Sequence, residues 1–129
     1  MAKINYYEYS KRDEKYAKDM YSLGNYDPCG RFCQQSVEKR MKHYLEIYGE
    51  VEDMYMFSSH NLGRLYDRIC VLSKNKADRA VRGDLSRLTD YYFDTNYPNE
   101  QGNIELDEEM AQDAIGVMVS VNGWIDGLL

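Results

Sequence analysis

Apolar residues recur every three or four positions between residues 33 and 48, and this spacing is the strongest constraint on how the chain folds. One helix face would carry Cys33, Val37, Met41, Tyr44, Leu45 and Tyr48. Gln34, Glu38 and Lys42 form an i, i+4 series on another part of the same surface. The spacing therefore predicts one long amphipathic helix.

The remaining sequence predicts four more helices and no strand. The first runs from about Tyr6 to Leu23, with Tyr9, Tyr16, Met20 and Leu23 on one stripe and Gly24 as its stop. The long second helix begins at Asp27-Pro28, as N-cap and first helical residue, and ends at Tyr48 before Gly49.

Residues 50–59 are predicted to form a loop, and Ser58 or Ser59 to cap the third helix. The apolar faces expected for the last three helices are Leu62, Leu65, Tyr66 and Ile69; Val81, Leu85, Leu88 and Tyr92; and Met110, Ala114, Met118, Val121, Ile125 and Leu128. Residues 73–76 and 99–106 would be polar connections, and the fifth helix would start near Asp107. The expected fold class is all-α, an up-and-down bundle of about five helices in one domain, residues 1–129.

The charge is distributed unevenly along the chain. Residues 1–87 carry all 16 Lys and Arg against 13 acids, whereas residues 88–129 carry nine acids and no base. This excludes a uniformly basic nucleic-acid-binding module. The acidic segment forms either solvated helix faces or a surface for a basic partner.

The sequence also sets expectations for localisation and metals. It has no run of 18 apolar residues and no apolar signal segment, so the expected location is the cytoplasm, without membrane contact. The three cysteines are an odd number and do not show the spacing of a disulfide framework, which fits a reducing compartment. Cys29 and Cys33 stand at i, i+4, but no second ligand pair has zinc-site spacing, so buried thiols are expected and no metal or cofactor.

Three segments resemble landmarks of the HEPN family (higher eukaryotes and prokaryotes nucleotide-binding domains). They are QQSVEKRMKHYL at 34–45, SHNL at 59–62 and YYFDTNYP at 91–98. The resemblance implies an all-α HEPN bundle that is frequently a homodimer, with the fourth helix near the interface. It also implies a possible minimal nucleotidyltransferase partner, and either ribonuclease toxicity or nucleotide or RNA binding without catalysis.

Active family members carry an R-x4–6-H motif at the end of this fourth helix. Here Arg87 stands at the arginine, but the histidine falls where the chain has Phe93 or Asp94, and Asn96 replaces a further arginine. Cleavage through the 2′-hydroxyl requires a group that titrates near neutral pH and a cation beside the phosphate. The resemblance therefore predicts a degenerate catalytic site; if activity survives, Arg87, Asp94 and Tyr97 would carry it.

Two groups of residues are candidates for binding a nucleotide or RNA. The first is Arg87, Tyr91, Asp94, Asn96 and Tyr97, doubled across a dimer axis; the second is Lys39 and Lys42, with Arg31 and Arg40 on a basic strip. The alternatives are that Arg87 pairs with an acid, and that the lysines pair along their helix with Glu38 and Glu46.

Other polar and apolar residues have more ordinary roles in this interpretation. His60 would cap or pack at the start of the third helix, and His43 would be exposed. Residues 54–57, of sequence MYMF, would contact a partner or cover the end of the bundle.

Three functions follow from these expectations. The first is a non-catalytic nucleotide- or RNA-associated HEPN module that acts with a partner, such as a minimal nucleotidyltransferase, in a toxin–antitoxin-like system. The second is a diverged metal-independent HEPN ribonuclease toxin. The third is a helical protein-interaction module without nucleotide binding.

Overall fold

The computed structural model describes residues 5–96 and 105–129, which form an all-helical bundle. The elements are α1 (Tyr6–Ser22), α2 (Tyr26–Tyr48), the 3-10 helix η1 (Val51–Ser58), α3 (Leu62–Ser73), α4 (Arg79–Asn96) and α5 (Glu108–Leu128). This confirms the predicted all-α class. None of the helices described is long and apolar enough to cross a membrane.

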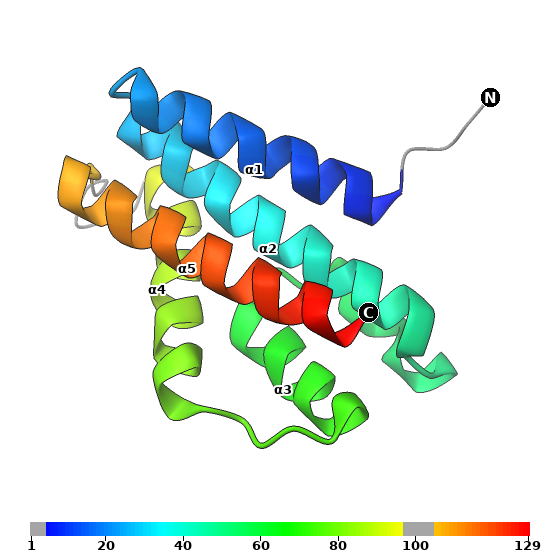
Figure 1. Cartoon of the computed structure of the whole chain (residues 1–129). Coiled ribbons are helices and arrows are strands. Elements are labelled where there is room, and N and C mark those ends of the chain that lie inside the picture. The colour runs from blue at the N-terminus through cyan, green and yellow to red at the C-terminus, as the bar shows by residue number, and fades with distance from the viewer. Residues whose placement is uncertain (1–4, 97–104) are drawn as a thin grey trace.

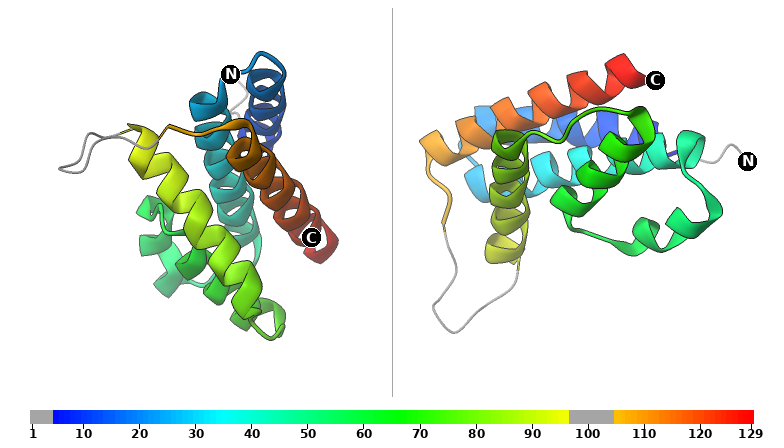
Figure 2. Two further views of the ribbon diagram at one scale, coloured as in Figure 1. Left: turned by 90° about the vertical axis from the view of Figure 1, so that its left-hand side faces the viewer. Right: turned by 90° about the horizontal axis from the view of Figure 1, so that it is seen from below.

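The long helix α2 lies at the centre and contacts every other helix (Figure 1). α1 and α5 run along α2, whereas α4 crosses it steeply. α3 and α4 lie together on the side of α2 away from α1 (Figure 2). The end of α4 therefore meets α2 and the start of α3, where the sequence places its candidate site.

The apolar stripe predicted for α2 is confirmed over most of its length. Cys33, Val37 and Met41 are completely buried, and burial of such side chains stabilises the fold by about 1.5–3 kcal/mol each. Tyr48 departs from the prediction because α2 extends past the bundle there, leaving its ring half exposed against Tyr44.

The stripe predicted for α1 is confirmed only in part, because Met20 packs against the core but Tyr16 and Leu23 are exposed. Leu23 is 68% exposed, and the residues that α1 buries are Ser10, Asp13 and Ala17. These side chains are small or polar because α1 packs closely on a polar seam of α2. An apolar stripe search cannot find such a face.

Several helix starts also differ from the predictions. α2 begins at Tyr26, and the Asp27 carboxylate accepts a hydrogen bond from the amide of Leu106, at 2.7 Å, rather than capping its own helix. Asn61 caps α3 by accepting from the Arg64 amide at 3.1 Å, so neither Ser58 nor Ser59 does.

The segment predicted as a loop, residues 50–59, forms η1 instead. Glu50 and Asp53 make a capping box that satisfies backbone amides at its start, which explains why the short helix forms. Met56 is buried and Met54 is exposed, so this segment both covers the bundle and presents apolar surface.

Candidate functional site

Arg87 on α4 forms ion pairs with two carboxylates. Its Nε and Nη2 donate to the two oxygens of Asp113 on α5, at 3.2 and 3.1 Å, and Nη2 also donates to Asp84 at 2.9 Å. These hydrogen bonds raise the pKa of Arg87 further above its ordinary value. The alternative that Arg87 pairs with an acid is therefore what the structure shows.

Tyr91 joins the same cluster. Its hydroxyl donates to Asp113 at 3.2 Å, and burial followed by the Asp113 charge raises the pKa of Tyr91. The structure thus brings Arg87 and Tyr91 together, as predicted for one helix face. Asp113, which the sequence analysis did not single out, connects them, because α5 passes beside this face of α4.

The remaining predicted members of the cluster are only partly described. Asp94 is half-buried, and burial together with the Asp94 charge raises the pKa of Asp90. The side chain of Asn96 and all of Tyr97 lie outside the described residues. The part of the cluster that is described contains more acids than bases.

Lys39 and Lys42 are not exposed phosphate ligands. Lys39 pairs with the buried Asp13 of α1, and Lys42 donates to Glu38 at 3.0 Å. Lys42 and Glu38 are each 4% exposed. The alternative of pairing along the helix is confirmed for Lys42, whereas pairing of Lys39 with another helix was not predicted.

The other two basic residues of the predicted strip are also engaged. Arg40 is buried and donates from Nη1 to both oxygens of Asp126, at 2.8 Å. Arg31 donates to the Thr95 carbonyl at 3.2 Å, which ties α2 to the end of α4. Most residues of the basic strip therefore form ion pairs or hydrogen bonds with other helices.

Glu38 organises a hydrogen-bond network that includes His60. Its Oε1 accepts from Gln34 at 3.2 Å and lies 2.9 Å from His60 Nδ1, while Oε2 accepts from Lys42. A carboxylate offers only acceptors, so neutral His60 carries its proton on Nδ1 and has Nε2 as the acceptor. The i, i+4 series 34, 38, 42 was the sequence signal for this network.

His60 packs at the start of α3, as predicted, and it also lies beside the end of α4. Its ring centroid is 6.3 Å from that of Tyr92 and 6.5 Å from that of Phe93. A hollow of about 410 Å³ opens here, lined by Ser59, His60, Asn61, Ser86, Thr89, Asp90 and Phe93. An imidazole thus reaches the end of α4 from the connection between η1 and α3.

His43 and the cysteines complete the predicted residues. His43 was predicted to be exposed, which is wrong: it is half-buried because the Tyr7 ring of α1 packs on it at 5.0 Å. Cys29 and Cys33 are buried as predicted, and hydrogen bonding with Cys29 together with burial raises the pKa of Cys33. Within residues 5–96 and 105–129, no group of three His, Cys, Asp or Glu is placed to hold a metal.

Comparison with protein families connects this arrangement to known domains. The family model described as HEPN domain matches residues 5–128. The chain belongs to the HEPN family. Comparison with curated proteins found no match.

Two solved structures share the HEPN fold of this chain. One is described as TT1696 from Thermus thermophilus, with a TM-score of 0.78 and 18% identity over 96% of this chain and 95% of that one. The other is described as ST0689, an archaeal HEPN homologue, with a TM-score of 0.70 and 18% identity over 95% and 93% of the two chains. At this identity the likeness concerns the fold.

Proposed function

We propose that this HEPN protein is a non-catalytic, nucleotide- or RNA-associated binding module that acts with a partner protein. The double ion pair of Arg87 carries the proposal. A cation that stabilises a phosphorane must meet the phosphate, but Asp84 and Asp113 already occupy this guanidinium. Their charges would also repel an approaching phosphate.

Exposed acids of α4 and α5 support a basic protein partner. Asp90 of α4 is exposed, Glu108 and Glu109 are exposed in the first turn of α5, and α5 contains no Lys or Arg. Exposed charges of one sign attract a partner of the opposite sign. A minimal nucleotidyltransferase in a toxin–antitoxin-like pair is the partner that family membership favours, and a homodimer is proposed on the same ground.

The experiment combines an RNA-cleavage assay with co-purification. We expect the purified chain to leave cellular RNA intact. We also expect a nucleotidyltransferase encoded by a neighbouring gene to co-purify with the chain at low salt and to be lost at high salt. RNA cleavage that disappears in Arg87→Ala would overturn the non-catalytic assignment. Co-purification that is unchanged by high salt would contradict the electrostatic part.

His60 supports the second candidate, a diverged ribonuclease. Glu38 fixes its tautomer, and the ring lies beside Phe93, where the family histidine would fall. This candidate predicts toxicity on expression of the chain alone, and cleavage that is lost in His60→Ala. Intact RNA and normal growth under strong expression would exclude it.

A further inference from the structure

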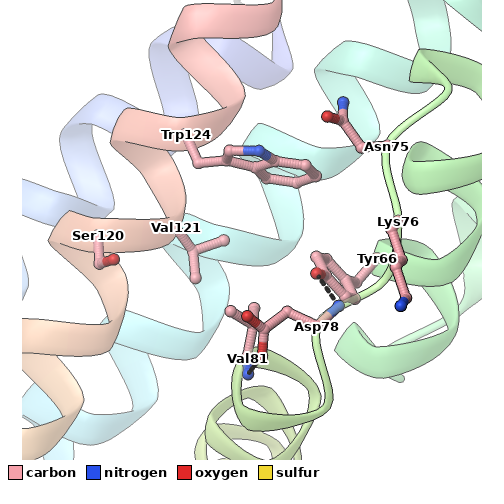
Figure 3. A pocket seen from close by; sticks show the side chains of 8 residues that line it. All are labelled: Tyr66, Asn75, Lys76, Asp78, Val81, Ser120, Val121 and Trp124. Atoms are coloured by element: carbon pink, nitrogen blue, oxygen red, sulfur yellow. Dashed lines mark hydrogen bonds between the residues drawn. The ribbon is translucent and has the colours of Figure 1, made fainter.

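A second hollow, of about 320 Å³, lies between α5 and the connector from α3 to α4 (Figure 3). Trp124 and Val121 of α5 and Tyr66 of α3 give it an apolar wall, and Asn75, Lys76 and Asp78 of the connector give it a polar rim. Figure 3 shows the Trp124 ring extending from α5 toward the connector. This volume is at the lower end of the range for small-molecule sites.

The walls of this hollow are held in place by contacts within the chain. The Tyr66 hydroxyl accepts a hydrogen bond from the Asp78 amide at 2.8 Å, and the Tyr66 and Trp124 rings lie 5.4 Å apart between centroids. Lys74 takes the left-handed conformation, with φ 60° and ψ 36°, and the Asn75 amide donates to the Cys70 carbonyl at 2.9 Å. The hollow is therefore preformed.

The rim of this hollow carries one cation, Lys76, and one carboxylate, Asp78. The Asp78 carboxylate accepts from the amides of Ala80 and Val81, at 2.8 and 3.3 Å, so the start of α4 already compensates its charge. Lys76 is exposed, and it forms no ion pair with any residue in the described part of the chain. An anion that approaches Lys76 would therefore displace no ion-pair partner from it.

We propose that this hollow binds a small planar aromatic ring that carries one anionic group, either a phosphate or a carboxylate. The ring packs on Trp124 and Val121, because an indole offers a large apolar surface for stacking. The anion meets Lys76 at the rim. The inference rests on the nucleotide-associated part of the proposed function, and it places that ligand away from Arg87.

Trp124 makes the test direct, since it is the single tryptophan of the chain. Its emission would be followed during titration with four probes: AMP, nicotinate, adenosine and ribose 5-phosphate. We expect saturable binding of AMP, which carries a phosphate, or of nicotinate, which carries a carboxylate, and we call the tighter of the two the preferred probe. Adenosine lacks the anion and ribose 5-phosphate lacks the ring, so each should bind at least about tenfold more weakly.

Variants separate the contributions of the two parts. Lys76→Ala should weaken binding of the preferred probe about tenfold, Lys76→Arg should retain it, and Lys11→Ala, an exposed lysine of α1, should have no effect. Calorimetry on Trp124→Phe should show weaker binding without relying on the fluorescence signal.

Three results would overturn the inference: no saturable change with either AMP or nicotinate, adenosine binding as tightly as the preferred probe, or full affinity of Lys76→Ala for that probe. Co-purification of a nucleotidyltransferase with Lys76→Ala distinguishes a failure of this ligand site from a failure of the proposed partner interaction. Retained co-purification with no ligand binding would reject this site while leaving the proposed partner interaction intact.

Discussion

Ser10 of α1 and Ser36 of α2 exchange hydrogen bonds. The Ser10 hydroxyl donates to the Ser36 carbonyl at 2.6 Å, and the Ser36 hydroxyl donates to the Ser10 carbonyl at 2.8 Å. Asn122 of α5 also donates to the Ser36 hydroxyl, at 3.0 Å. Two small side chains thus let α1 approach α2 closely while both hydroxyls remain hydrogen-bonded.

Replacing Ser36 by Val should destabilise the protein by about 2–4 kcal/mol, because the added methyl groups overpack the contact and the Asn122 amide loses its acceptor. Urea unfolding followed by circular dichroism measures the change. Ser86→Val, at an exposed position of α4, is the matched control. Equal stability of the two variants would show that the close contact contributes nothing.

The buried Glu38–Lys42 pair should matter far more than an exposed pair of the same kind. Glu38→Gln leaves the Lys42 ammonium buried without a counter-charge, which should cost about 3 kcal/mol. Lys15 and Asp19 form an exposed pair of nearly equal length, 3.2 Å, on α1. Lys15→Gln should cost less than about 0.5 kcal/mol in the same unfolding measurement.

Removing the acids around Arg87 should free its guanidinium to bind an anion, which the paired guanidinium of the wild-type chain cannot do. The double variant Asp84→Asn, Asp113→Asn keeps the hydrogen-bonding shapes but leaves the guanidinium without carboxylates. We expect single-stranded RNA to bind this variant more tightly at low salt, and the gain to shrink as salt rises. Asp19→Asn with Asp67→Asn changes the charge equally elsewhere, and an equal gain there would contradict a specific role of Arg87.

Asp53 should make stability depend on pH in the acid range. Burial acts in the opposite direction, but hydrogen bonds from Arg68 and from the Glu50 amide outweigh it and lower the pKa of Asp53. Because the pKa of Asp53 is lower in the folded state, its carboxylate stabilises the protein at pH values above the pKa of the unfolded state, about 3.9. This stabilisation is lost as the pH falls through the pKa of the folded state.

The variant Asp53→Asn should therefore be less stable than wild type at pH 7 by about 1–2 kcal/mol, and the difference should shrink toward pH 3. Urea unfolding at both values measures it. A difference that stays constant with pH would mean that the carboxylate charge is not the cause.

Much of the fold was predictable from spacing, because α3 and the core face of α2 bury one continuous apolar stripe. Leu62, Leu65 and Ile69 are completely buried, as their positions in the sequence predict. The packing of α1 was not predictable, since serine and aspartate at a core face look like a solvated surface. The prediction of a helix start was wrong where a side chain expected to cap its own helix instead makes a long-range hydrogen bond, as Asp27 does with Leu106.

The candidate site was predictable only in part, for a similar reason. Helical spacing places Arg87 with Tyr91 because both belong to α4. Helical spacing cannot show that Asp113 of α5 accepts hydrogen bonds from both residues, or that His60 contacts Glu38 of α2. These contacts join positions 22 or more residues apart.

Arg40, in the middle of α2, has a consequence for how the two ends of the chain are held. Its guanidinium binds Ser10, near one end of the chain, through Nε, and Asp126, three residues before the last, through Nη1. Unwinding of α1 at Ser10 or of α5 at Asp126 would therefore remove a hydrogen-bond partner from the guanidinium of Arg40. Any change that unwinds the last turn of α5 would leave this buried guanidinium without its carboxylate partner.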